Sequence, residues 1–153
     1  MSIAELSALG TNVLGDIATL LIGDKISDGS ARSVYQCKLR PDLVVKIENV
    51  ARSFQNIEEF NTWEMVRDTD YAKWFAPVEY ISTCGIAMLM KKTEPGPTFA
   101  YPEQMPAFFT DLKYGNFGWL EDRLVCHDYG FNLMRNTGLT KRTRKANWWS
   151  INQ

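Results

Sequence analysis

The chain has 153 residues, of which 45% are apolar and 12% aromatic, and its formal net charge is −1. This composition fits one globular domain with an apolar core and argues against disorder. The chain has neither an overall basic balance nor an apolar run of about eighteen residues, so neither nucleic acid nor a membrane is expected as a partner. The three cysteines are far apart and form no zinc-binding pattern, which favours free thiols in a reducing cytoplasm.

The first part of the chain predicts strand pairs on either side of a helix. Apolar residues at helical spacing predict helices, and β-branched or alternating runs between turn residues predict strands. The expected elements are a helical segment at 3–21, strands at 33–39 and 43–47, a helix at 56–67, and strands at 76–82 and 85–91. This order indicates an α+β fold in which one long helix packs on an antiparallel sheet.

The second part of the chain predicts shorter elements. The stretch "TEPGP" at 93–97 breaks regular structure. We expect a short helix at 102–109 and a hairpin formed by 118–119 and 124–127. No internal repeat is visible.

Lys46 interrupts the β-branched run of residues 43–47. Side chains alternate along a strand, so Lys46 faces away from Val45 and Ile47. A lysine in this position is usually an exposed charge at a sheet edge. An acid of the following helix could instead hold it inward, and the candidates are Glu58, Glu59 and Glu64.

Acids and an amide recur at fixed spacing between residues 111 and 130. The pattern Asp111-x-Lys113-x-x-Asn116 is followed by Asp128-Tyr129-Gly130. Such groups suit metal and phosphate chemistry. They are also common turn residues of a β-hairpin, so this pattern alone leaves both interpretations open.

Taken together, these patterns resemble the motifs of protein kinases. The matches are Asp111-x-Lys113-x-x-Asn116 with the catalytic loop, Asp128-Tyr129-Gly130 with D-F-G, Val44-Val45-Lys46 with the end of V-A-I-K, "SDGSARSV" with the glycine-rich loop (Gly29 and Val34 in register), and "IAMLMKK" near Met90 with the strand that touches adenine. The resemblance covers 22–131. It looks nearest to small, divergent kinase-like proteins of bacteria and their phages, which would place the protein in a bacterial cytoplasm.

The sequence also departs from the kinase pattern. Ser27 and Arg32 stand where the loop would have its first and third glycines, and Phe109-Thr110 replaces the usual His-Arg. The interval between Met90 and the catalytic loop is too short for the helices of a full kinase, and no A-P-E motif follows. The resemblance therefore implies a kinase-like N-lobe with a strongly reduced C-lobe.

The resemblance implies an ATP- and Mg²⁺-binding protein made of one kinase-like domain. Its parts would be an N-terminal helical segment (1–21), an N-lobe-like part (22–94), a reduced catalytic segment (95–131) and a basic tail (132–153). The implied residues are Gly29, Ser30, Arg32, Val34, Lys46, Glu59 and Met90 for nucleotide, Asn116 and Asp128 for Mg²⁺, and Asp111 and Lys113 for transfer to a hydroxyl. Glu59 is the favoured partner of Lys46. A phosphotransferase and a pseudokinase-like binding module both remain open, and a protein partner or second copy could complete the small lobe.

The tail and His127 have simpler interpretations. Basic residues without any acid follow Asp128, and they are usually solvated. Trp148 and Trp149 are adjacent and cannot both face one core, so at least one is expected to be exposed. The tail is expected either to cover the underside of the catalytic loop or to dock a partner. A structural hydrogen bond is favoured for His127, and a place in or beside the core for Trp63, Trp74 and Trp119.

Overall fold

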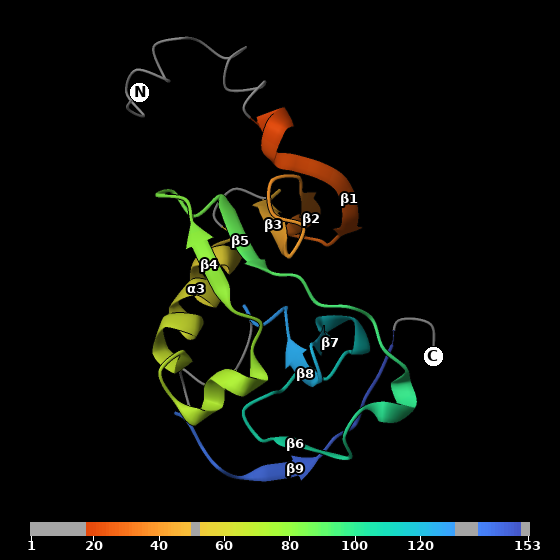
Figure 1. The fold of residues 1–153 in the computed structure, drawn as a ribbon. Helices are drawn as coiled ribbons and strands as arrows, with labels where there is room; N and C mark the ends of the chain where they lie inside the picture. The colour runs from red at the N-terminus through yellow and green to blue at the C-terminus, as the bar shows by residue number, and fades with distance from the viewer. Residues whose placement is uncertain (1–17, 50–52, 131–137, 151–153) are drawn as a thin grey trace.

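The upper half of the protein is a five-stranded antiparallel sheet with one helix beside it (Figure 1). The computed structural model describes residues 18–49, 53–130 and 138–150. The strands are β1 (Ile22–Asp28), β2 (Arg32–Cys37), β3 (Leu43–Glu48), β4 (Val78–Ile81) and β5 (Ala87–Lys91). Their order is β1-β2-β3-β5-β4, so β3 lies at the centre.

The helix α3 (Gln55–Val66) docks on the sheet mainly through polar side chains. Its buried residues are Asn56, Glu59, Thr62 and Val66, which recur at helical spacing. Asn56 donates from its amide to the backbone oxygens of Gly85 and Ile86, both at 3.0 Å. The helix is therefore held by specific hydrogen bonds as well as by apolar contact.

A strand residue caps the start of α3. Phe54 precedes the helix in a left-handed conformation (φ 55°) and provides no side-chain cap. Instead, the carboxylate of Glu48, at the end of β3, accepts from the backbone N–H groups of Phe54 (3.1 Å) and Asn56 (2.8 Å). A carboxylate at this end of a helix also complements the helix dipole. Glu48 thereby ties the helix to the central strand.

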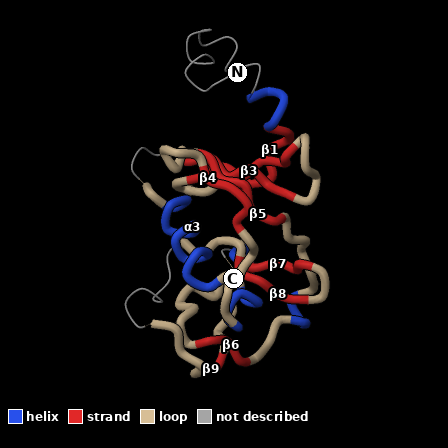
Figure 2. Tube along the Cα trace, turned by 60° about the vertical axis from the view of Figure 1, so that its left-hand side comes forward, coloured by secondary structure: helices blue, strands red, loops and turns tan. Residues whose placement is uncertain are grey.

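The lower half consists of short strands and 3₁₀ turns (Figure 2). The elements are η1 (Asp70–Trp74), η2 (Thr98–Ala100), β6 (Gln104–Pro106), η3 (Tyr114–Asn116), β7 (Phe117–Leu120), β8 (Arg123–Cys126) and β9 (Thr143–Lys145). β7 and β8 form a hairpin, whereas β6 pairs with the distant β9. Within the described residues, no helix has the length and apolar character needed to cross a membrane.

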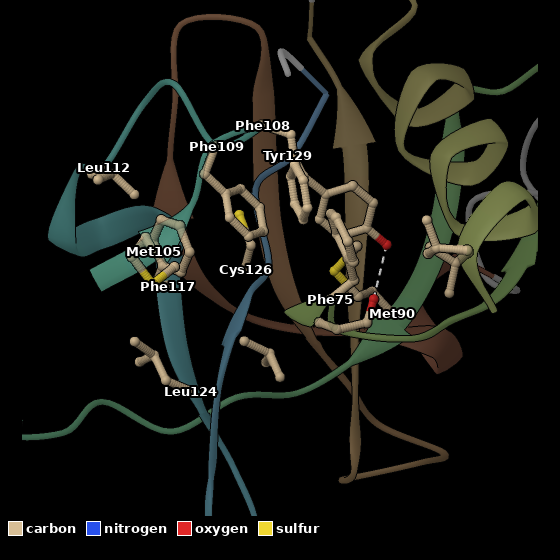
Figure 3. Close-up of a cluster of buried hydrophobic side chains, with 14 of the residues drawn as sticks. Phe75, Met90, Met105, Phe108, Phe109, Leu112, Phe117, Leu124, Cys126 and Tyr129 are labelled. Atoms are coloured by element: carbon tan, nitrogen blue, oxygen red, sulfur yellow. Dashed lines mark hydrogen bonds between the residues drawn. The ribbon is translucent and has the colours of Figure 1, made fainter. Parts of the chain in front are cut away.

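One apolar core continues from the sheet into the lower half. Val44, Met88 and Met90 of the sheet belong to the same buried cluster as residues of the lower half. Figure 3 shows the rings of Phe75, Phe108, Phe109 and Tyr129 grouped in this cluster. The rings of Phe75 and Tyr129 meet edge to face, 5.0 Å apart between centroids. The two halves are thus joined by a shared interior.

Several predicted elements are confirmed. The helix, the two strand pairs around it and the β7–β8 hairpin all lie where the sequence predicted them, with small differences at their ends. Trp63, Trp74 and Trp119 lie at the edge of the core, as expected. Of the helical segment predicted at 3–21, only residues 18–21 lie within the described part, and they are helical.

Two features differ from the sequence-based expectation. The helix predicted at 102–109 is wrong, because residues 104–106 form β6 and pair with β9 in the tail. Pairing with a distant segment overrides the local preference there. The strand β1 was not predicted either. It is polar and mostly exposed, so it lacks the apolar alternation that indicates a strand.

Candidate functional site

A cleft of about 600 Å³ lies where the sheet meets the lower half. Its walls come from β1, β2, β3 and β5, from residues 92–95, and from the segments around Asp111, Asn116 and Asp128. The predicted residues that line it are Gly29, Ser30, Arg32, Val34, Lys46, Met90, Asp111, Lys113, Asn116 and Asp128. Glu59 does not line the cleft but lies directly behind it, bonded to Lys46. Residues from five parts of the sequence therefore converge on one cavity.

Strand register explains the upper wall. Val34 on β2 lies opposite Lys46 on β3, and Val44 lies opposite Met90 on β5. Since alternate residues share a face, these four side chains point to the same side of the sheet. The neighbouring residues Leu43 and Val45 face the other side and join a separate apolar cluster. The prediction that Lys46 faces away from Val45 is confirmed, and of the two alternatives the structure shows the inward one, since Lys46 is buried.

The β7–β8 hairpin explains the spacing between Asn116 and Asp128. Phe117 at the start of β7 pairs with Cys126 at the end of β8. Asn116 directly precedes Phe117, and Asp128 follows Cys126 by two residues. Asn116 and Asp128 therefore both lie at the open end of the hairpin. The backbone oxygen of Asn116 accepts from the N–H groups of His127 (2.9 Å) and Asp128 (3.3 Å). The hairpin interpretation and the site interpretation of this segment are therefore compatible.

A buried network of charges lies at the back of the cleft. Lys46 donates to one carboxylate oxygen of Glu59 at 2.8 Å, and Arg32 donates to the other, also at 2.8 Å. Arg32 further donates to Asp128 at 2.6 Å and to the side chain of Asn56 at 3.2 Å. The network pairs two cations with two anions. Lys46, Arg32 and Glu59 are almost fully buried, whereas about half of the Asp128 side chain is exposed to the cleft.

Burial and ion pairing oppose each other in this network. Burial by itself would raise the pKa of Glu59, but Lys46 and Arg32 outweigh it and lower that pKa from 4.5 to about 2. Burial lowers the pKa of Lys46, and the attraction of Glu59 offsets this only in part. Burial also acts against the charge of Arg32, yet Glu59 and Asp128 raise its pKa overall. Glu59 is thus a fixed negative charge between two cations.

His127 has a structural role, as predicted. Its Nε2 bonds the backbone oxygen of Gly115 at 2.9 Å, and because a carbonyl can only accept, Nε2 carries the proton. Nδ1 then accepts from the hydroxyl of Thr93 at 2.7 Å. Burial, followed by the charge of Lys46, lowers the pKa of His127, which agrees with a neutral ring. The backbone oxygen of His127 also accepts a hydrogen bond from Lys46.

Asp111 lies at the lower edge of the cleft with both carboxylate oxygens hydrogen-bonded. Asn116 donates its side-chain N–H to Oδ2 at 2.9 Å, and Trp149 donates its indole N–H to Oδ1 at 3.1 Å. The ammonium group of Lys113 lies 5.7 Å from the centre of the Trp149 ring, a cation–π arrangement. Asp111, Lys113 and Asn116 therefore form one group, together with a residue of the tail.

Two residues of the site were missed at the sequence level. Asn56 joins Arg32 to the backbone beside β5, but a buried asparagine on a helix gives no pattern that could be recognised. Trp149 lines the cleft although it lies 38 residues from Asp111 in the sequence. The Trp148–Trp149 pair was a usable signal, and the predicted exposure of one member is confirmed, since Trp149 is 43% exposed.

Comparison with known proteins finds structural likeness at low identity and no match by sequence. No family model and no curated protein matches the sequence. Among solved structures, the chain is similar to that of a ternary complex of streptomycin, ATP and APH(2")-IIa, with 16% identity and a TM-score of 0.42. The match covers 56% of this chain and 29% of the other, so the chain spans less than a third of that structure. A likeness of this extent establishes neither a family nor a ligand.

Proposed function

We propose that the protein is a minimal kinase-like domain that binds ATP with Mg²⁺ and transfers phosphate to a hydroxyl group. One observation carries the proposal. Ten of the eleven residues predicted from kinase-like motifs line the same cleft, and the eleventh, Glu59, holds Lys46 behind it. Residues that only form turns would not be expected to converge on the same cleft as residues of the sheet.

Each part of the cleft suits one part of a nucleotide. Val34 and Met90 provide apolar surface for the base, and Lys46 provides a positive charge for the phosphates. Asp111 can accept the proton of an attacking hydroxyl, and Lys113 can neutralise charge on the transferred group. Transfer of this kind requires positioning and charge neutralisation more than covalent chemistry.

Asn116 and Asp128 fit a magnesium ion that is shared with phosphates. Asn116 uses its amide nitrogen for Asp111, so its oxygen is the atom suited to a cation. In the described residues, no group of three or more His, Cys, Asp or Glu side chains could hold a metal alone. Mg²⁺ is commonly bound by one or two protein groups together with substrate phosphates, and there it neutralises phosphate charge. The ion would compete with Arg32 for Asp128.

A second candidate function is a nucleotide-binding module that acts on a partner without catalysis. The ion pair between Arg32 and Asp128 favours it, because a cation of the protein then occupies one oxygen of the acid proposed for Mg²⁺. A protein partner or a second copy of the chain would then bind next to the small lower half. Both candidates require nucleotide in the cleft, but only the first requires Asp111 to accept a proton.

Thermal melting with and without millimolar MgATP tests the shared part of both candidates. A ligand at about ten times its Kd stabilises the native state by about 1.4 kcal/mol, which raises Tm by a few degrees in a chain of this size. Asp128→Asn should reduce this shift. Asp122→Asn is a matched control, because Asp122 is exposed at the opposite end of the same hairpin. Absence of any shift in the wild type would overturn nucleotide binding.

Asp111→Asn separates the two candidates. This variant should keep the MgATP-induced shift and lose phosphotransfer, measured as phosphate release and by intact mass after incubation with ATP. If the wild type binds MgATP but releases no phosphate and gains no mass, the binding module is the better description.

A further inference from the structure

The tail of the chain is built into the lower edge of the cleft. β9 pairs with β6, and four residues later the tail runs beside the catalytic-loop-like segment. Trp149 donates its backbone N–H to the oxygen of Leu112 at 3.1 Å and accepts from the N–H of Tyr114 at 2.9 Å. Two backbone hydrogen bonds, one on each side of Lys113, therefore fix the position of Trp149.

The two adjacent tryptophans have different surroundings. Trp148 is partly buried, stacks on Tyr114 at 5.6 Å and meets Phe117 edge to face at 5.0 Å. Its indole N–H donates to the backbone oxygen of Pro102 at 2.8 Å. Trp149 instead faces the cleft and bonds Asp111. The contacts of Trp148 are sufficient to anchor the tail. They do not explain why Trp149, which is half exposed, lies at the edge of the cleft.

The hydrogen bonds at Asp111 restrict how its carboxylate can turn. Asn116, five residues after Asp111, bonds one oxygen, and Trp149, in the tail, bonds the other. A carboxylate offers about four lone-pair positions, so two remain to accept a proton. A carboxylate held at both oxygens has fewer orientations to lose when a hydroxyl group approaches.

We infer that Trp149 is a positioning residue, which orients Asp111 from the C-terminal tail for proton acceptance. The inference rests on the proposed phosphotransfer function. It gives the tail a part in the reaction in addition to covering the lower half. The ring of Trp149 also holds the ammonium group of Lys113 through the cation–π contact.

The full-length chain with Trp149→Phe or Trp148→Phe provides the test. Trp149→Phe keeps a ring but removes the N–H, so kcat for MgATP turnover should fall about tenfold, the effect of losing one hydrogen bond to a charged group. KM for MgATP and the MgATP-induced melting shift should change little. Trp148→Phe should lower Tm without changing kcat, since Trp148 does not reach the acid.

An NMR measurement tests the contact without relying on activity. The indole ¹H–¹⁵N signal of Trp149 is identified by its loss in Trp149→Phe. Asp111→Ala should shift this signal and leave that of Trp148 in place. Absence of MgATP binding by the wild type would reject the proposed function itself. The role of Trp149 alone is overturned if MgATP turns over at the same kcat in Trp149→Phe, or if Asp111→Ala leaves the indole signal unmoved. MgATP binding without turnover in the wild type also overturns that role.

Discussion

Replacing Glu59 by glutamine should destabilise the protein by about 3 kcal/mol at neutral pH, because two buried cations lose their shared anion. One oxygen of Glu59 accepts from Arg32 (2.8 Å) and from the backbone N–H of Tyr129 (2.9 Å), and the other accepts from Lys46 (2.8 Å). Glutamine has nearly the same size but carries no charge, and its amide nitrogen cannot accept. Within the described residues, Asp128 is then the only carboxylate paired with Arg32 or Lys46.

Glu64→Gln is a matched control on the same helix. Glu64 pairs with Arg67 at 2.7 Å, but both side chains are more than 40% exposed. An exposed pair of this kind contributes less than about 1 kcal/mol. Both variants exchange the same residue types in α3, so their helix propensities change equally. The difference between them isolates the effect of burial.

Urea unfolding of the three proteins measures the difference, and its pH dependence gives a second check. The folded pKa of Glu59 is about 2 against an ordinary 4.5, a difference that corresponds to about 3 kcal/mol. A lowered pKa means that this stability is present above about pH 5 and is lost as pH falls towards 2. Glu59→Gln should lack this part of the acid sensitivity. Equal stability of the Glu59→Gln and Glu64→Gln variants would refute the charge network.

Three further predictions concern packing, the tail and a thiol. Gly96→Ala should destabilise the protein by about 1–3 kcal/mol, because an added Cβ would lie 2.1 Å from the Trp119 ring. Gly115→Ala is the control and should leave Tm nearly unchanged, because the atom nearest to its added Cβ is 3.8 Å away. Equal Tm values for the two variants would contradict this packing. A chain truncated after Gly138 loses β9 and the packing of Trp148 against the core, so its Tm should fall by several degrees. An unchanged Tm would exclude the covering role of the tail. A thiol reagent should modify only Cys84 in the native protein, because the other two thiols are buried. A backbone hydrogen bond also lowers the pKa of Cys84, which favours the reactive thiolate. Labelling that persists in Cys84→Ser would show that a buried thiol is accessible.

The elements predicted best were those stabilised by nearby parts of the chain. Residues 43–47 form a β-branched run with one lysine, and the run predicted both the strand and the opposite face of Lys46. The choice of Glu59 over Glu58 and Glu64 is confirmed by the ion pair with Lys46. The strand and its two faces depend on periodicity, which a single sequence displays directly, whereas the choice of Glu59 came from the resemblance to kinases.

The features that were missed depend on distant parts of the chain. Within the "PEQMPAFF" stretch, predicted as a short helix, residues 104–106 form a strand because residues 143–145 lie alongside them. Trp149 reaches Asp111 only after the tail has passed beneath the lower half. The use of Arg32 as a buried link between Glu59 and Asp128 likewise required the positions of three separate elements. None of these pairings leaves a periodic signal in the sequence.

The cap that Glu48 places on α3 has a consequence for motion. Glu48 fixes the first turn of the helix to β3, and the Lys46–Glu59 pair fixes its second turn to the same strand. The helix cannot swing away without breaking both attachments, so sheet and helix are expected to move as one rigid body. On the connection after β5, the N–H of Lys92 bonds Asp42 of the upper half, while Glu94 pairs with Trp119 of the hairpin. The hydroxyl of Thr93 bonds His127 on the lower side, so a hinge for opening the cleft would lie at the link between Lys92 and Thr93.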